Sequence, residues 1–265
     1  MRKSLLILLT TGIALTPAYS QWVNFKAKGI PRLPDGKPNL SAAAPKLAGG
    51  TPDLSGTWWV PGDVFEGLDH APPKFALNLA ADLKPGDVEL LPDAAALFAR
   101  RGSGLGKDYP ATRCTPPGLP LSFTIPEPFK IIQAPGLIAI LYEYPNSFRQ
   151  IFTDGRALPQ DPVPSYLGYS VAKWDGRTLV VETTGFNDRT WLDLMGHPHS
   201  EALHMTERYL RRDFGHMDVE LTVDDPRSYR KSWTAKIGVE LYPDTELFEY
   251  ICEENERDIS HLVGK

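Results

Sequence analysis

The chain of 265 residues has few cysteines, few histidines and no excess of positive charge. Its formal net charge is −5, with 28 Lys and Arg against 33 Asp and Glu, and it carries no basic patch that could bind a phosphate backbone. We therefore expect no nucleic-acid partner. Beyond the first twenty residues, no stretch is long and apolar enough to cross a bilayer, so we expect no membrane insertion once those residues are removed.

Several motifs of catalysis and cofactor binding are also missing. GSGLGKD, residues 102–108, is one residue too short for a phosphate-binding loop and has Asp108 where Ser or Thr is needed. GYSVA, residues 168–172, lacks the final glycine of a nucleophile elbow. No H-E-x-x-H sequence occurs. We therefore expect no nucleotide cofactor, and none of these motifs assigns a reaction.

The N-terminal residues predict export. Arg2 and Lys3 precede the apolar run SLLILLTTGIALT, and small residues stand before Gln21, which is the pattern of a bacterial signal peptide over residues 1–20. A periplasmic or secreted location follows. Cys114 and Cys252 are the two cysteines, and an even count in an exported chain predicts a disulfide. A redox pair or metal ligands would be the alternative, but there is no C-x-x-C spacing.

Composition divides the rest of the chain into two parts. Residues 21–52 are rich in Pro, Gly and Ala without a sustained period, which predicts an irregular N-terminal arm. Residues 53–265 are predicted to form a single β-rich domain. One or two short helices are expected within 72–102, because LPDAAALFARRG has Pro92 and Asp93 at a helix start and Gly102 at its end.

Strand patterns dominate from residue 129 onward. FKIIQAPGLIAILYEY indicates two strands around Pro135-Gly136, and YLGYSVAKWDGRTLVVETTGF indicates two strands joined by a tight turn at Asp175-Gly176. HMTERYLRRDFGHMDVELTVDD is a further pair, and SWTAKIGVELY and ELFEYICEE follow. About eight to ten strands with short hairpins predict a mainly β fold, an antiparallel up-and-down barrel or a bent sandwich. An eight-stranded barrel can hold one small ligand inside.

Two resemblances agree with this fold. SGTW, with Gly56 and Trp58, is similar to the G-x-W phrase that opens the first strand of lipocalin-like barrels. PDLSGTWW, RQIFTDGR, YSVAKWDGRTLVVETTGFNDRTWL and HSEALHMTERYLRRDFGHMD resemble a family of exported bacterial proteins of unknown activity, over most of residues 50–255. This resemblance implies a mostly β single domain outside the cytoplasm. It implies no reaction and no catalytic residue.

The histidines are concentrated, with four of the six between residues 196 and 218. His197 and His199 alternate across one proline, so both can point the same way in an extended chain. Together with His204 and a carboxylate such as Glu201 or Glu207, they are candidate ligands of a divalent metal ion, zinc or copper. Ordinary hydrogen-bonded or solvent-facing histidines on a strand connection would give the same spacing.

The same segment suggests acid/base chemistry. In a strand, His204, Thr206, Arg208, Leu210 and Arg212 share one face, and Glu207 lies on the opposite face. If the first face lines a polar cavity, His204 can transfer protons and Arg208 can orient an anionic group. If it is the outer surface, its arginines form cross-strand ion pairs. Asp193 is a candidate partner for a histidine.

The functional hypothesis combines these residues. It describes an exported lyase, isomerase or hydrolase that acts on a small, partly apolar molecule in a pocket at one end of the barrel. The alternative is a binding protein without chemistry, or a metal-dependent version of either. The enzyme hypothesis predicts polar groups that converge in a cavity, whereas the binding-protein hypothesis predicts a mainly apolar cavity with the histidines outside it.

The candidate site residues fall into three groups. The candidate catalytic residues are His199, His204, Arg208, Asp193 and Glu207, and the candidate ligand-binding residues are Phe186, Trp191, Arg212 and Tyr169. Further polar groups that could line a cavity or be ordinary sheet residues are Tyr142, Tyr144, Arg149 and Tyr166.

Overall fold

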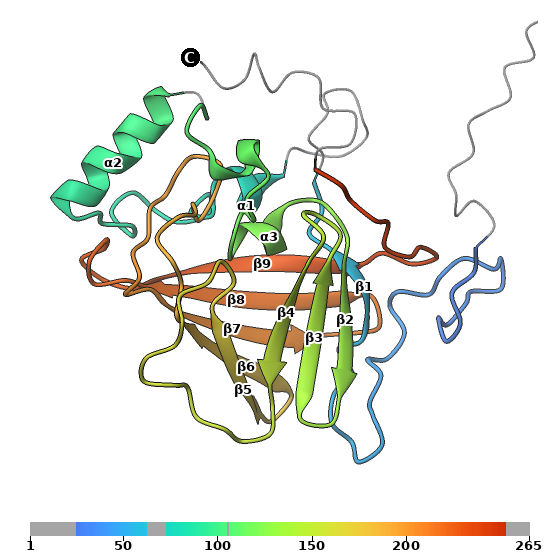
Figure 1. Cartoon of the computed structure of the whole chain (residues 1–265). Coiled ribbons are helices and arrows are strands. Elements are labelled where there is room, and N and C mark those ends of the chain that lie inside the picture. The colour runs from blue at the N-terminus through green and yellow to red at the C-terminus, as the bar shows by residue number, and fades with distance from the viewer. Residues whose placement is uncertain (1–24, 63–72, 105, 253–265) are drawn as a thin grey trace, which may run out of the picture.

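The protein is a closed barrel of nine strands that follow one another around the ring in sequence order (Figure 1). The computed structural model describes residues 25–62, 73–104 and 106–252, so the predicted signal peptide lies outside the described residues. The predicted mainly β barrel is confirmed. The strands are β1 (Gly56–Trp59), β2 (Phe129–Ala134), β3 (Leu137–Tyr142), β4 (Ser147–Phe152), β5 (Tyr169–Asp175), β6 (Thr178–Thr184), β7 (His204–Arg211), β8 (His216–Asp224) and β9 (Trp233–Leu241).

A ring with an odd number of strands cannot alternate in direction all the way around, so at least one neighbouring pair must be parallel. Here that pair is β4–β5, and its pairing covers only Ile151 with Ser170 and Phe152 with Val171. Every other neighbouring pair is antiparallel, including β1–β9, which closes the ring. We call this short parallel pairing the β4–β5 seam.

The β5–β6 hairpin confirms the predicted tight turn. Asp175 pairs with Thr178, which leaves a two-residue loop that begins at Gly176. Gly176 has φ of 59°, the left-handed conformation that two-residue hairpin loops need at this position and that glycine adopts without strain. The β2–β3 pair likewise turns at the predicted Pro135-Gly136, and β7 and β8 form the further pair that the sequence predicted.

Within the described ranges, three helices and a 3₁₀ turn lie outside the strands: α1 (Lys74–Leu77), α2 (Pro92–Ser103), Pro110–Arg113 and α3 (Leu121–Thr124). The predicted helix over 92–102 is confirmed as α2, with proline and an acidic residue in its first turn and arginines in its last, which suits the helix dipole. The sequence did not predict α3. It lies at one end of the barrel, where Phe123 packs on Phe129 at 5.2 Å and on Tyr209 at 6.1 Å between ring centroids (Figure 1).

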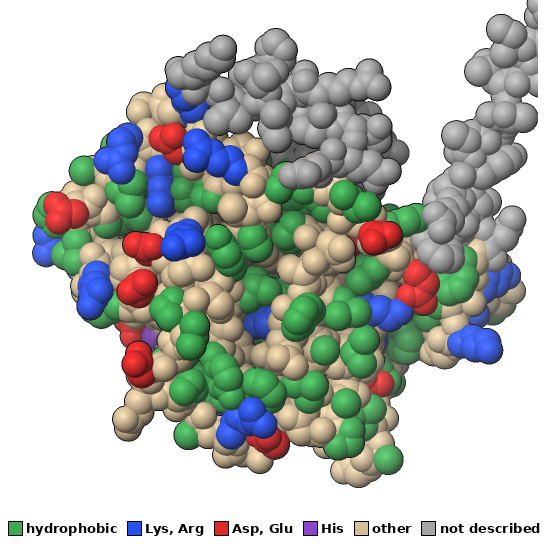
Figure 2. Space-filling model, in the orientation of Figure 1, with side chains coloured by type: hydrophobic (Ala, Val, Ile, Leu, Met, Phe, Trp, Pro, Cys, Tyr) green, Lys and Arg blue, Asp and Glu red, His purple; other side chains and the backbone are tan. Residues whose placement is uncertain are grey.

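Inward-facing side chains fill the barrel. On β8 the predicted apolar face is confirmed, because Met217, Val219, Leu221 and Val223 are all buried. On β7 the inner face consists of Met205, Glu207, Tyr209 and Arg211, and the alternate residues face outward. Trp58 is also fully buried, and its Nε1 donates to the Leu54 carbonyl at 3.0 Å. On the outer face in Figure 2, apolar side chains gather over β2–β4.

ELFEYICEE, residues 246–254, does not form the predicted strand in the part that the structure describes, which ends at residue 252. Its alternation of apolar and polar residues suits a strand, but a strand needs an edge to pair with. Because β9 already pairs with β1, Trp58 opposite Leu241, the closed ring offers no free edge to the residues that follow β9.

The N-terminal arm contains the same turn twice. In the first copy, Leu33 N–H donates to the Lys37 carbonyl at 2.9 Å and Gly36 N–H to the Leu33 carbonyl at 2.8 Å. In the second, Leu47 donates to Thr51 at 2.9 Å and Gly50 to Leu47 at 3.0 Å. Each turn is closed by a β-bridge that ends at a proline. Each is followed by a leucine that packs on the barrel core, namely Leu40 after the first turn and Leu54 after the second.

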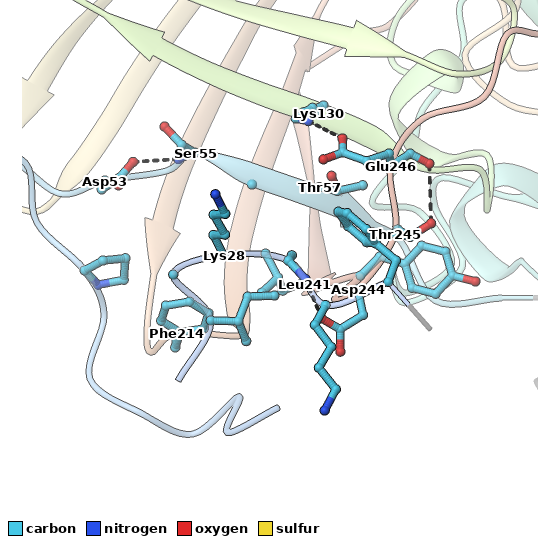
Figure 3. Close-up of a pocket in the computed structure, with 18 of the residues that line it drawn as sticks. Lys28, Asp53, Ser55, Thr57, Lys130, Phe214, Leu241, Asp244, Thr245 and Glu246 are labelled. Carbon is cyan, nitrogen blue, oxygen red and sulfur yellow. Dashed lines mark hydrogen bonds and ion pairs between the residues drawn. The ribbon is translucent and has the colours of Figure 1, made fainter. Parts of the chain in front are cut away.

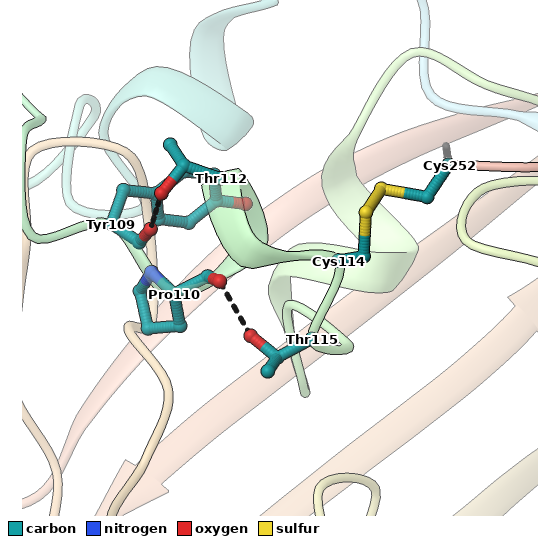
Figure 4. The surroundings of a disulfide bond; sticks show 6 residues. All are labelled: Tyr109, Pro110, Thr112, Cys114, Thr115 and Cys252. Atoms are coloured by element: carbon teal, nitrogen blue, oxygen red, sulfur yellow. Dashed lines mark hydrogen bonds between the residues drawn. A yellow bond between two sulfur atoms is a disulfide. The ribbon is translucent and has the colours of Figure 1, made fainter. Parts of the chain in front are cut away.

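Cys114 and Cys252 form a disulfide, with Cα atoms 5.7 Å apart, so this prediction is confirmed (Figure 4). The bond joins the segment that leads into α3 to the residues that follow β9. Structural disulfides persist mainly in oxidising compartments, so the bond fits an extracytoplasmic protein. Within the described residues, no helix has the length and apolar character that a membrane span requires.

Candidate functional site

One histidine of the loop between β6 and β7 is held by a buried carboxylate. Asp193 Oδ2 lies 2.6 Å from His197 Nδ1 and also accepts from the Leu79 N–H at 2.8 Å. The other carboxylate oxygen accepts from the N–H groups of Gly196 and His197, at 3.1 and 3.2 Å. These contacts fix the carboxylate and place the imidazole proton on Nδ1, which leaves Nε2 as a proton acceptor. Asp193 is therefore a histidine partner, as predicted, and the histidine is His197.

Aromatic side chains surround this Asp193–His197 pair. The His197 ring packs on Phe98 of α2 at 4.4 Å and on Trp233 of β9 at 6.1 Å between centroids. Arg101 donates to the Gly196 carbonyl at 3.2 Å and lies over Trp191, with 4.9 Å from its guanidinium carbon to the ring. The predicted ligand-binding residue Trp191 is thus buried in this packing. The pair lies between α2 and the barrel, with little exposed surface.

His199 has both ring nitrogens occupied. Nδ1 donates to the Ser200 carbonyl at 3.3 Å, so Nε2 accepts from the Thr190 hydroxyl at 2.7 Å. Burial lowers the pKa of His199, which keeps the ring neutral. The predicted ligand-binding residue Phe186 is buried with its edge against the His199 ring, at 6.1 Å. The candidate catalytic residue His199 therefore has no ring nitrogen left for a substrate.

The prediction that His204 and Arg208 line a polar cavity is wrong. Both residues lie on the outer face of β7, because the apolar Met205 and Tyr209 face the core. Arg208 forms an ion pair with Asp175 at 3.0 Å, and Arg212 forms one with Asp218 at 3.1 Å. This face therefore matches the alternative of an outer surface with cross-strand ion pairs. His204 is half-buried, and its Nε2 is covered without a hydrogen-bond partner among the described residues.

The candidate metal ligands are not brought together. In the described parts of the chain, no three His, Cys, Asp or Glu side chains are placed to hold a metal ion. His197 Nδ1 is hydrogen-bonded to Asp193, and both ring nitrogens of His199 are hydrogen-bonded. His204 lies on the outer face of β7. The prediction that His197, His199 and His204 hold zinc or copper is therefore wrong. Hydrogen bonds within the loop satisfy two of the three rings.

A second polar cluster lies inside the barrel. Arg149 and Glu207 form a two-pronged ion pair, in which Nη1 lies 3.0 Å from Oε1 and Nη2 contacts Oε2. Arg149 also donates from Nε to Ser170 at 3.0 Å and from Nη2 to Thr183 at 2.8 Å. The Tyr209 hydroxyl donates to Glu207 Oε1 at 2.7 Å. We call these five residues the barrel polar network. The candidate catalytic residue Glu207 belongs to this network, and its hydrogen-bond partners are Arg149 and Tyr209 and not a histidine.

The network is buried, with the Arg149 and Glu207 side chains 1% and 0% exposed. Burial by itself lowers the pKa of Arg149, but the charge and hydrogen bonds of Glu207 outweigh it and raise that pKa above the usual value. Burial, followed by the Glu207 charge, raises the pKa of Tyr209 well above its usual value. A buried ion pair contributes little to stability compared with apolar packing, because both ions lose their hydration. Such a pair inside a barrel therefore suggests a functional role.

A pocket of about 370 Å³ opens beside this network, at the β4–β5 seam. It is lined by residues from both faces of β4, so it lies at the edge of that strand, where pairing with β5 covers only two residues. We call it the seam pocket. Most of its exposed lining is apolar, and no histidine is among its described lining residues. It is lined by Pro116, Ser147, Phe148, Arg149, Gln150, Phe152, Ser165, Tyr166, Leu167, Gly168, Tyr169 and Ser170.

A larger hollow, of about 620 Å³, lies between the N-terminal arm and β1 and β9 (Figure 3). Its three carboxylates already have partners: Glu246 is paired with Lys130, Asp244 is paired with Arg32, and Asp53 accepts from the Ser55 N–H at 2.8 Å. Asp244 also accepts from the Ala27 N–H at 3.0 Å. These ion pairs attach the arm and the residues after β9 to the rest of the chain. We interpret the hollow as the space between these packed segments.

The sequence marks Tyr169 and Arg149 as groups that could line a cavity, but the pairing of Arg149 with Glu207 was not predicted. A signal for the pairing exists. Glu207 falls between Met205 and Tyr209 in the inward phase of β7, and Arg149 is in phase with inward Ile151 on β4. Opposite charges at inward positions of two strands indicate a buried pair. No family model, curated protein or solved structure matches the chain, so its function is interpreted from this geometry.

Proposed function

We propose that this is an exported bacterial protein, periplasmic or secreted, that binds a small, partly apolar molecule in the seam pocket. One observation carries the proposal: a mainly apolar pocket reaches Arg149 and Ser170 of the barrel polar network from outside, at the interrupted part of the ring. A mainly apolar cavity with the histidines outside it is the arrangement expected of a binding protein. Small-molecule sites combine apolar walls with a few polar groups in the same way.

Filling the pocket tests the proposal. We would measure binding of 2-naphthol, decahydro-2-naphthol, menthol and octanoate by calorimetry and ligand-observed NMR, because these probes share size and partial polarity but differ in shape and charge. Ser147→Phe places a ring in the pocket, and Ile132→Phe on the exposed outer face of β2 is the matched control. We expect at least one probe to bind and to lose affinity in Ser147→Phe only. If no probe binds, or if Ser147→Phe folds and binds unchanged, the proposal fails.

The second candidate is an enzyme of lyase, isomerase or hydrolase type with His197 as its base. The Asp193–His197 contact at 2.6 Å favours it, because a carboxylate that fixes one ring nitrogen leaves the other free to take a proton. Hydrolysis of 4-nitrophenyl acetate probes the hydrolase version. His197→Gln should lower turnover by roughly 10²–10⁴-fold if His197 is the base. The control is His216→Gln, since His216 lies 2.7 Å from Asp213 in a similar pair that is partly exposed. Equal rates in both variants would exclude His197.

A further inference from the structure

The outer rim of the seam pocket is aromatic and held in place. Phe152 and Tyr169 stack with 5.3 Å between ring centroids. Arg156 covers Phe152 at 3.8 Å and donates to the Tyr169 hydroxyl at 3.1 Å. Asp154 in turn holds Arg156 through two hydrogen bonds of 2.9 and 2.6 Å. The rim therefore presents fixed ring surface, which costs a stacked ligand little ordering entropy.

Phe148 adds a ring that the protein itself does not cover. It lines the seam pocket from the outer side of β4, and 66% of its surface is exposed. Within the described residues it has no aromatic or cationic partner, whereas Phe152 has both. An exposed aromatic side chain beside a pocket has a ring face available for stacking on a bound ring. Phe148 is therefore the side chain on which a bound ring would stack.

The floor of the pocket offers hydrogen bonds but no net charge. Ser147 Oγ is buried there, and it has no hydrogen-bond partner in the parts of the chain that the structure describes. Arg149 directs four of its five N–H donors to Glu207, Ser170 and Thr183. Because Glu207 cancels the charge of Arg149, the floor does not select an anion. It suits a neutral oxygen: a ligand hydroxyl can donate to the Ser147 hydroxyl or accept from it, and a ligand carbonyl can accept from it.

From these two surfaces we infer the ligand class, an inference that rests on the proposed binding function. The seam pocket takes a flat, neutral aromatic molecule with a hydroxyl or carbonyl oxygen. The ring lies against Phe148 and the Phe152–Tyr169 rim, and the oxygen points to Ser147. A pocket of about 370 Å³ has room for a molecule of one or two fused rings. Stacking on an aromatic side chain favours such a ring over a saturated one by roughly 2–10-fold.

Two probes with the same skeleton test this. 2-Naphthol and decahydro-2-naphthol both carry two fused six-membered rings and one hydroxyl, but only the first is flat and aromatic. We expect calorimetry to show 2-naphthol binding roughly 2–10-fold more tightly. Phe148→Ala should remove most of this preference, Phe148→Tyr should keep it, and Ile132→Ala, another exposed apolar position on the barrel surface, should leave it unchanged. Ser147→Ala should weaken 2-naphthol but not naphthalene.

The outcomes separate the ligand class from the proposed function. Equal affinity for both alcohols, lost in Ser147→Phe, would refute the aromatic ligand and leave small-molecule binding in the pocket intact. A preference for 2-naphthol that survives Phe148→Ala would refute the role of Phe148 and with it this inference. If none of the four probes binds at all, the proposed function fails together with the inference.

Discussion

Glu207 and Arg149 place opposite charges inside a largely apolar barrel, where neither can keep its hydration. Removing one partner leaves the other as an uncompensated buried charge. We therefore expect Glu207→Gln or Arg149→Met to lower the free energy of unfolding by about 3–5 kcal/mol. The double variant Arg149→Met with Glu207→Gln should lose less than the sum of the two single variants, since no charge remains buried.

Urea unfolding of the single and double variants measures this coupling. The outer pair provides the matched control, because Arg208 and Asp175 are also 3.0 Å apart but are both exposed. Substituting either of those residues should change stability by no more than about 1 kcal/mol. Equal effects at the inner and outer pairs would show that the Arg149–Glu207 pair is not desolvated as described.

His199 gives the protein an acid-sensitive stability. Burial lowers its pKa in the folded chain below the ordinary value of 6.5. As the pH falls through the ordinary value, the unfolded chain takes up a proton that the folded chain takes up only at lower pH. The free energy of unfolding therefore falls with decreasing pH in this window and is fully retained above it. We expect His199→Gln to flatten the dependence between about pH 7.5 and 5 in urea unfolding. If the free energy of unfolding depends on pH in His199→Gln as it does in the wild type, His199 is not the source of the acid sensitivity.

At the scale of elements, the leucine that follows the second arm turn tests whether the end of the arm is anchored in the folding unit. Leu54, after the second turn, is 1% exposed and packs in the core, whereas Leu33 inside the first turn is 43% exposed. We expect Leu54→Ala to cost about 2–5 kcal/mol by leaving a cavity. Leu33→Ala should stay within about 0.5 kcal/mol. Thermal and urea unfolding should show one shifted transition for Leu54→Ala; an unshifted main transition would mean that the segment after the second arm turn packs independently of the barrel.

Local sequence patterns predicted the elements that local physics determines. The β5–β6 hairpin could be predicted because its turn carries Asp175 and Gly176, and α2 because Pro92 begins it. α3 could not, because its four residues are helical inside the barrel end, where all are buried, and no amphipathic face marks them. His204 points outward because of which residues of β7 face the core. The sequence does not show this, since charged residues occur on both faces of the strand.

The candidate site shows the same limit. Tyr169 could be proposed as a ligand contact because its hydroxyl is one of the polar groups on the strands that could line a cavity. The seam pocket itself could not be predicted, since it arises from the number of strands in the closed ring and from where the chain places the necessary parallel pair. No single segment of the sequence determines the number of strands or the position of the parallel pair. Arg149 and Glu207 lie on strands far apart in sequence, so their pairing follows from barrel closure.

For the whole molecule, the disulfide sets how far the unfolded chain can expand. It closes a loop of 138 residues that contains every strand except β1. In the chain-entropy model, a loop of this length contributes roughly 4–5 kcal/mol by restricting the unfolded state. We therefore expect the variant with Cys114→Ser and Cys252→Ser to unfold at lower urea concentration. Its transition should also be steeper, because its unfolded chain exposes more surface.

Reduction provides the independent comparison for this last prediction. Wild-type protein unfolded and refolded in dithiothreitol should match the double serine variant in midpoint and slope, while dithiothreitol should not affect the variant. Because α3 follows Cys114 closely and fills one end of the barrel, loss of the bond should also loosen α3 before the strands separate. Hydrogen exchange would then be faster at residues 121–124 than in β8. A reduced protein with the midpoint of the oxidised one would show that the loop does not restrict the unfolded chain.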